Sequence, residues 1–383
     1  MEQTKTELHT HLMGMMTAEG FIDFLSQYLD CIYWPMNGTI SNANQTVPIA
    51  SILQDKDALN SLRIPHGEQV DYFTLDDRYA TRTELLKLAA HSTYSKLYDR
   101  LEDEYPNISD EDKRKIITQQ AEETVYNDYI NRSLQELVNQ NVKYVEISYS
   151  NPRRIAGFQL DRSLQNKITC KFLLSTDRSR TTRNMKQSAK ALRKLLSQGT
   201  SVGVDIMGQE RPFSIEELDY NNSRSFQKKL EILFDELLQY DNTTLRIHSG
   251  EIPAQNNTLI TLRMIDQISK KKGFEIPPTE IRIGHGLHFN PSEDYVNLLK
   301  KFHCIVELNA SSNFGLKNIK DYNEVPYSYY LEHDIPVVIA TDGHGLYDTT
   351  ISKEDAIAKS HTTEEEYQTI LQTDRDILEK KVR

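Results

Sequence analysis

Two histidines stand close together near the start of the chain, in the segment ELHTHLMG. His9 and His11 are two positions apart, and side chains at i and i+2 of a β-strand point to the same face. A same-face histidine pair can bind a metal ion, but two ordinary polar residues of an early strand would have the same spacing. The pair alone therefore leaves both interpretations open.

Polar residues at the ends of later β-rich segments favour the metal. His248 lies in RIHSGE and Asp342 in IATDG, each where a strand would deliver its last side chain to one rim. Three histidines and one carboxylate form a nitrogen and oxygen ligand set that suits a borderline divalent ion, above all Zn²⁺ with an open position for water. We therefore predict that both residues join the N-terminal histidine pair in one metal site.

Two further titratable residues lie beside these positions. Glu251 follows His248 by three residues, and His285 lies in the segment RIGHG, where the predicted strand ends. A carboxyl group on the loop beyond a metal histidine is placed for proton transfer to a substrate atom, although a solvated loop glutamate is the alternative. The segment SVGVDIMG (201–208) has no lysine of the kind that bridges two metals in binuclear barrel hydrolases, which favours a single ion.

The elements that must position these residues alternate along the chain. Short β-rich runs bounded by Gly, Asn or Pro are separated by longer segments with a helical pattern. The predicted strands cover 6–12, 143–150, 169–176, 201–208, 244–250, 281–286, 304–311 and 336–343. The predicted helices cover 82–101, 111–140, 181–198, 223–240, 258–272, 292–302 and 324–333. Eight alternating strands predict a (β/α)₈ barrel, whose catalytic face lies at the C-terminal ends of its strands.

The first connection of this barrel is unusually long. About 130 residues separate the first two predicted strands, far more than a crossover helix needs. We expect residues 1–383 to form one domain that carries residues 30–140 as an insertion. The insertion is either a surface decoration or a lid, and we favour a lid because an insertion after a strand lies on the catalytic face.

Composition and charge exclude several classes of protein. The chain has 45 Lys and Arg against 56 Asp and Glu, a net charge of −11, which argues against nucleic acid as a partner. Its three cysteines are few and far apart, so neither a disulfide framework nor a cysteine zinc site is expected. No long apolar run and no signal-peptide pattern is present, so we expect no membrane partner and a cytoplasmic location.

Seven short motifs resemble the adenosine deaminase branch of the amidohydrolase superfamily. In family order they are ELHTHLMG (7–14), YVEISYS (144–150), VGVDIMGQE (202–210), RIHSGE (246–251), RIGHG (282–286), ELNASSN (307–313) and ATDGHG (340–345). The tail segment TTEEEYQTIL (362–371) is also similar to the C-terminal helical segment of that family. Each motif alone has low specificity, but seven in order are specific.

The resemblance implies a role for each matching residue. The four predicted ligands would hold one Zn²⁺ per chain. Glu251 would donate a proton to purine N1, while His285, together with Asp342, would orient and help deprotonate the attacking water. Gly208 would offer its backbone N–H to purine N3. The implied reaction replaces the amino group at C6 by water, releases ammonia and leaves a hypoxanthine ring.

Two positions depart from the family pattern. The family motif HxHLDG has an Asp that hydrogen-bonds the 5′-hydroxyl, and this chain has Met13 at that position. The family motif TDDP has a second Asp that contacts purine N7, and this chain has Gly343 there. The next residue, His344, is the candidate to make the contact with N7 instead. A neutral Met13 would remove the repulsion between an Asp and a 5′-phosphate, and Arg153 and Arg154 are candidates to bind that phosphate. Alternatively, Met13 is a variant lining and the arginines are ordinary surface charges.

We therefore favour deamination of an adenine 5′-nucleotide (AMP, dAMP or a higher phosphate) over that of free adenosine or deoxyadenosine in purine salvage. Divergent family members act on nucleotides in some prokaryotic antiviral systems, so antiviral defence is suggested by analogy. Two other hypotheses are an amidohydrolase acting on a different cyclic amine or amide, and a non-catalytic purine-nucleotide sensor. The 20 tyrosines and the large insertion suggest a surface for a homo-oligomer or a partner protein.

Overall fold

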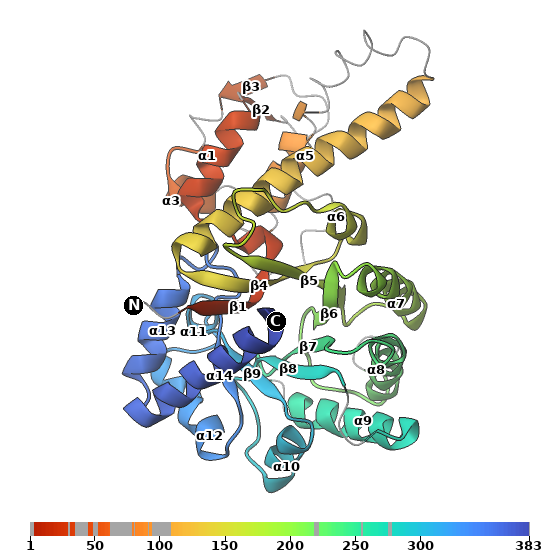
Figure 1. The fold of residues 1–383 in the computed structure, drawn as a ribbon, viewed down its shortest axis with the longest axis vertical. Helices are drawn as coiled ribbons and strands as arrows, with labels where there is room; N and C mark the ends of the chain where they lie inside the picture. The colour runs from red at the N-terminus through yellow and green to blue at the C-terminus, as the bar shows by residue number, and fades with distance from the viewer. Residues whose placement is uncertain are drawn as a thin grey trace.

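The computed structural model describes residues 4–29, 31–34, 45–48, 53–61, 79, 81–90, 92–93, 109–217, 222–253, 256–274 and 278–382. Eight parallel strands form one sheet in the order β1-β4-β5-β6-β7-β8-β9-β10, and Figure 1 shows helices arranged around them. The strands are β1 (Lys5–His11), β4 (Val142–Tyr149), β5 (Thr169–Asp177), β6 (Ser201–Met207), β7 (Thr244–Ser249), β8 (Glu280–His285), β9 (Ile305–Leu308) and β10 (Val337–Ile339). Each overlaps a predicted strand, which confirms the (β/α)₈ barrel.

The barrel closes between β1 and the segment that follows β10. Thr10 forms an isolated parallel bridge with Asp342, and the Asp342 N–H donates to the His9 carbonyl at 2.8 Å. β10 ends at Ile339, earlier than the predicted 336–343, and Asp342 itself has a left-handed backbone with a φ of 61°. The closure therefore places a residue from near the C-terminus beside the N-terminal histidines.

The helices around the barrel bury one face each. They are α6 (Pro152–Gly157), α7 (Thr182–Ser197), α8 (Ser223–Leu237), α9 (Asn257–Lys272), α10 (Glu293–Lys301), α11 (Ala310–Gly315), α12 (Tyr327–Glu332), α13 (Ile351–Ser360) and α14 (Glu364–Val382). α7 shows why they form: the Thr181 side chain accepts from the Asn184 N–H, and Met185, Leu192 and Leu196 are buried at helical spacing.

The predicted helices at 111–140, 181–198, 223–240, 258–272, 292–302 and 324–333 each overlap an observed helix. The prediction at 82–101 is matched by helical residues at 81–90, and much of its remainder lies outside the described residues. α6 and α11 were not predicted, because six residues are too few to show a helical period. None of the described helices combines the length and apolar character needed to cross a membrane.

The insertion after β1 begins with a short 3₁₀ turn, η1 (Leu12–Gly14). It continues through α1 (Ala18–Tyr28), β2 (Cys31–Trp34), β3 (Gln45–Pro48), α3 (Lys56–Ser61) and α5 (Asp110–Asn139), which gather at one end of the molecule (Figure 1). The Tyr129 hydroxyl of α5 donates to the Leu12 carbonyl at 3.0 Å, so the long helix is tied to the turn after β1. Much of 30–140 lies outside the described residues, and its function as a lid stays a prediction.

Candidate metal and active site

The four predicted metal ligands lie together at the C-terminal rim of the barrel. Asp342 Oδ1 is 3.4 Å from His9 Nε2 and 3.2 Å from His11 Nε2. The His248 ring centroid is 4.7 Å from that of His9 and 5.2 Å from that of His11. All four residues are buried. Segments more than 300 residues apart in the chain thus place four ligand-type side chains around one point.

The nitrogen atoms of this cluster are suited to a cation. His9 Nε2 and His248 Nε2 are buried and make no hydrogen bond of acceptable geometry within the described part of the chain. Buried polar atoms in folded proteins almost always have a partner, so a pair of buried imidazole nitrogens without one points to a missing ligand. Imidazole and carboxylate together suit Zn²⁺. The residues present therefore fit the predicted ion.

Two residues of the cluster, His248 and Asp342, have the protonation state that a metal ligand needs, whereas His9 does not. Burial and the Arg246 cation act to lower the pKa of His9, but contacts with two carboxylates outweigh them and raise it to about 9. Burial lowers the pKa of His248 well below its usual range. Burial acts to raise the pKa of Asp342, yet contacts with His11 and His9 hold it well below the usual range. Asp342 is thus anionic and His248 neutral, while His9 must release a proton when a cation binds.

Side chains from β9 and the segment that follows it contact two of the predicted ligands, His9 and Asp342, and orient them. Glu307 Oε2 lies 2.8 Å from His9 Nδ1, and Asn309 Nδ2 lies 3.3 Å from the same nitrogen. The Ser312 hydroxyl donates to Asp342 Oδ2 at 2.6 Å. Contacts of this kind fix the ring orientation and basicity of metal ligands. They leave His9 Nε2 and the other Asp342 oxygen facing the centre of the cluster.

Buried charges continue from these residues into the barrel interior. Asp205 Oδ1 is 3.3 Å from His248 Nε2, and Asp205 Oδ2 accepts from Arg246 at 2.8 Å. Arg282 lies 3.2 Å from Glu307 and 2.8 Å from Glu146, and Arg246 lies 3.8 Å from Glu307. None of the residues of this layer was predicted from the sequence. A charged residue inside an otherwise apolar strand, such as Asp205 in SVGVDIMG, is the signal that could have revealed it.

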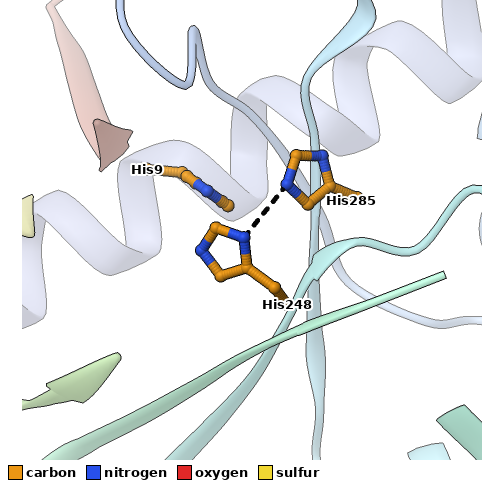
Figure 2. A group of neighbouring side chains, drawn as sticks. All are labelled: His9, His248 and His285. Carbon is orange, nitrogen blue, oxygen red and sulfur yellow. Dashed lines mark hydrogen bonds between the residues drawn. The ribbon is translucent and has the colours of Figure 1, made fainter. Parts of the chain in front are cut away.

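The predicted proton-transfer residues border the cluster of predicted metal ligands. His285 Nε2 lies 3.2 Å from His248 Nδ1, and Figure 2 shows the rings of His9, His248 and His285 turned toward one another. Glu251 Oε2 lies 3.8 Å from His285 Nε2. The Glu251 side chain keeps 14% of its surface exposed, whereas His285 keeps 1%. A partly accessible carboxyl group therefore stands next to a buried imidazole, an arrangement that can transfer protons to and from a bound substrate.

Gly208, predicted to contact purine N3, and Gly343, which departs from the family motif, occupy positions that disfavour a side chain. Gly208 has a φ of 103°, and a Cβ there would lie 2.4 Å from Asp177 Oδ2. Gly343 has a φ of 139°, and a Cβ there would lie 3.0 Å from the Gly14 Cα. Left-handed backbone and close approach both disfavour a side chain. The Asp that the family motif carries at the position of Gly343 would therefore meet the turn after β1.

The other departure from the family pattern is Met13, which is 2% exposed within η1. His344 is directed elsewhere than expected: its Nε2 lies 3.1 Å from Glu136 Oε2, which also accepts from the Thr17 N–H at 2.9 Å. His344 Nδ1 is buried and has no hydrogen-bond partner in the described structure. A substrate contact by His344 would have to use that nitrogen, and it stays a prediction.

The two predicted phosphate-binding arginines differ in their surroundings. Arg153 is exposed in α6. The Arg154 guanidinium lies 3.6 Å from the centre of the Tyr126 ring, donates to the Tyr149 hydroxyl at 2.6 Å and pairs with Glu122 at 2.9 Å. Arg154 is therefore held in a fixed orientation at the rim after β4, whereas the side chain of Arg153 extends into solvent.

Comparison with known proteins identifies the family of this chain. The chain matches the family described as Adenosine deaminase over residues 116–373. An adenosine deaminase of Enterococcus faecalis is 36% identical over 73 residues, which cover 19% of this chain and 22% of that protein. N6-Methyl-AMP deaminase-L of Xenopus laevis is 32% identical over 114 residues, which cover 30% of this chain and 29% of that protein. These alignments span less than a third of the relatives' own length.

The fold is also found among solved structures. The apo structure of the N6-methyl-AMP deaminase from Arabidopsis thaliana superposes with a TM-score of 0.59 at 17% identity, over 96% of this chain and 89% of that one. At this identity the likeness establishes the fold. The family match at 116–373 covers more than half of the 383 residues. His9 and His11 lie before it, and the fold brings them to His248 and Asp342. The chain belongs to the adenosine deaminase family.

Proposed function

We propose that this protein is a zinc-dependent deaminase that hydrolyses the C6 amino group of an adenine 5′-nucleotide. The observation that carries the proposal is the convergence of the four ligand-type side chains with Glu251 and His285 beside them. A binding module has no need of both a metal cluster and an adjacent acid and base. The proposed stoichiometry is one Zn²⁺ per chain.

The chemistry supplied by Zn²⁺ at His9, His11, His248 and Asp342 would be Lewis acidity, which lowers the pKa of a water molecule toward neutrality. The partly exposed Glu251 carboxyl group would protonate purine N1, which draws electron density away from C6. His285 would accept one proton from the attacking water and pass it on to the departing amino group, and the second proton of that water would return to Glu251, since N1 keeps the proton it received. One water is consumed, the C6–N bond breaks, and ammonia leaves with the hypoxanthine product.

Two features support a nucleotide rather than a nucleoside as substrate. Met13 places a neutral side chain in the turn after β1, so no carboxylate of that residue repels a phosphate. Arg154 is oriented at the rim and its Nε is buried without a hydrogen-bond partner in the described structure. The names of the Xenopus and Arabidopsis proteins refer to N6-methyl-AMP, a nucleotide. Deamination of free adenosine is the alternative.

Substrate preference tests this proposal directly. We expect Arg154→Met to raise the KM for AMP by roughly 10- to 100-fold, the effect of losing a hydrogen bond to a charged group, and to change the KM for adenosine little. Arg162→Met, at an exposed arginine of a nearby loop, is the matched control. Equal effects of Arg154→Met on both substrates, or a clear preference of the unaltered protein for adenosine, would contradict the nucleotide proposal.

A role in antiviral defence rests on analogy with divergent members of the family. It is tested by expressing the protein and its Glu251→Gln variant in bacteria that are then challenged with phage. Protection that depends on Glu251 is the expected result, and equal infection of both strains would contradict that role while leaving the proposed chemistry in place.

A further inference from the structure

We propose that Glu210 is a positioning residue that fixes the main chain of Glu251. The inference rests on the proposed function, which assigns proton donation to Glu251. Glu210 lies in the loop after β6, and its side chain reaches the loop after β7. It is 2% exposed. It is neither one of the predicted metal ligands nor one of the proposed proton-transfer groups.

The Glu210 carboxylate accepts hydrogen bonds from three consecutive residues of the loop after β7. The Gly250 N–H lies 3.1 Å from Oε1 and 2.9 Å from Oε2. The Glu251 N–H donates to Oε2 at 3.1 Å, and the Ser249 hydroxyl donates to Oε1 at 3.1 Å. One buried side chain thus binds the backbone on both sides of the Gly250 to Glu251 peptide bond.

The carbonyl groups of the same loop are bound from the opposite direction. The Ser249 carbonyl accepts from the Gly286 N–H at 3.0 Å. The Gly250 carbonyl accepts from the N–H groups of Leu287 and His288 at 3.1 and 2.7 Å. The loop is therefore clamped between Glu210 and the segment after β8. The loop that carries Glu251 is thus hydrogen-bonded to the segment that follows His285.

Backbone placement decides where the Glu251 carboxyl group lies. Gly250 adopts a φ of 78°, a left-handed conformation that turns the chain sharply, and Glu251 follows at once with its Oε2 3.8 Å from His285 Nε2. An error of 1 Å in the position of a reacting group can reduce a rate by about 10²-fold. Loss of the Glu210 contacts should therefore act on turnover more than on substrate binding.

A carboxylate is the side chain that these donors require. Its two oxygens offer about four acceptor sites, which suits donors from three residues. Glutamine has the same shape but only one acceptor oxygen, so its NH₂ group would face a backbone N–H donor. Glu210→Gln is therefore a substitution that replaces one of the two acceptor oxygens by a donor while it keeps the volume of the side chain.

The test compares Glu210→Gln with the unaltered protein and with Glu236→Gln. Glu236 is a suitable control because it is also buried and its carboxylate also accepts a hydrogen bond, from Arg193 at 2.6 Å in the outer helical layer. Residue-resolved amide hydrogen exchange at 249–251 and steady-state kinetics with AMP are measured, with bound zinc and thermal melting recorded for each protein.

We expect amide exchange at Gly250 and Glu251 to rise at least about tenfold in Glu210→Gln, while exchange in the barrel strands stays unchanged. We expect kcat per bound zinc to fall about 10- to 100-fold, with KM changed less than about threefold. Glu236→Gln should match the unaltered protein in both measurements. A general loss of stability would instead raise exchange throughout the barrel.

Unchanged exchange at 249–251 in Glu210→Gln, or a kcat equal to that of Glu236→Gln, would overturn the positioning role. If Glu210→Gln does not fold, the unaltered protein decides: rapid, unprotected exchange at Gly250 and Glu251 would overturn the clamp, and protection would support it. If the unaltered protein deaminates no adenine compound, the proposed function fails, and the exchange data alone still decide whether Glu210 holds the loop.

Discussion

The barrel contains two adjacent layers of buried charge that differ in how their polar atoms are used. In the inner layer, Arg246 and Arg282 lie against carboxylates, as in the 2.8 Å contacts to Asp205 and Glu146. In the layer at the rim, His9 Nε2 and His248 Nε2 are buried and lack hydrogen-bond partners in the described structure. In the inner layer each arginine faces carboxylates, whereas in the rim layer His9 Nε2 and His248 Nε2 lie 3.4 and 3.3 Å from the carboxylates of Asp342 and Asp205 without a hydrogen bond of acceptable geometry.

This difference separates a supporting function from a binding function. Buried ion pairs add little net stability, but removing one partner is costly because the other charge is left unpaired. The inner layer is therefore expected to hold Asp205 and Glu307 in place beneath the histidines. We expect the nitrogen atoms of the rim layer to gain partners when a cation binds. Substitutions in the two layers should therefore differ in their effects on bound zinc, zinc affinity and turnover.

The largest effect is expected from a rim ligand. His248→Ala should reduce bound zinc from one per chain to almost none and lower turnover by more than about 10⁴-fold, because water is roughly nine pKa units less acidic without the metal. Metal analysis and ammonia release measure both quantities. His333→Ala, at a histidine of the outer helices that contacts the Tyr329 carbonyl, is the control and should keep its zinc. Full zinc occupancy in His248→Ala would contradict the ligand assignment.

The next largest effect is expected beside the metal rather than on it. Glu251→Gln should lower kcat by about 10²- to 10⁴-fold, the usual contribution of general acid catalysis, and should retain its zinc. The pair of measurements distinguishes a proton-transfer residue from a ligand. Full activity in Glu251→Gln would remove the proposed acid.

A substitution between the two layers should act on metal affinity. Glu307→Gln removes the negative charge that lies 2.8 Å from His9 Nδ1, and it should weaken zinc binding by about 10- to 100-fold, as loss of a ligand-orienting partner does. Competition with a chromophoric chelator measures the affinity. If this variant binds zinc as tightly as the unaltered protein, Glu307 does not influence metal binding through His9.

The smallest effect is expected at the far end of β1, where α14 packs on the barrel. Burial raises the pKa of Asp374 to about 6, above its usual value of 3.8, and Thr6 donates a hydrogen bond to it. A raised pKa means that the folded state favours the protonated form of Asp374. The stabilisation that protonated Asp374 gives to the folded state is therefore full below pH 3.8 and is lost as pH rises through about 6.

Asp374→Asn should therefore raise the melting temperature at pH 8 by about 2 °C, corresponding to roughly 1 kcal/mol, and should change it little at pH 4. Zinc binding should be unaltered at both values, because the site lies at the opposite end of β1. A melting temperature shifted equally at the two pH values would show that ionisation of Asp374 is not the cause.

The sequence predicted the barrel and the rim better than the layer below. The strands were predictable because they are β-rich runs bounded by Gly, Asn or Pro. The polar residues at their ends, such as His248, were predictable as residues of the barrel rim. Asp205, Arg246 and Glu307 lie inside strands, where their partners come from neighbouring strands and sequence distance gives no pairing. Glu210 was missed because its function consists of contacts with backbone N–H groups of another loop, which leave no pattern in sequence.

The central claim is tested most directly by titrating metal-free protein with Zn²⁺ while ammonia released from AMP is measured. We expect activity to rise in proportion to added zinc, to stop rising at one ion per chain and to yield inosine monophosphate. Ammonia release that does not depend on zinc would rule out a zinc-dependent deaminase. So would its absence at one zinc per chain with AMP, dAMP, ATP, adenosine and deoxyadenosine alike.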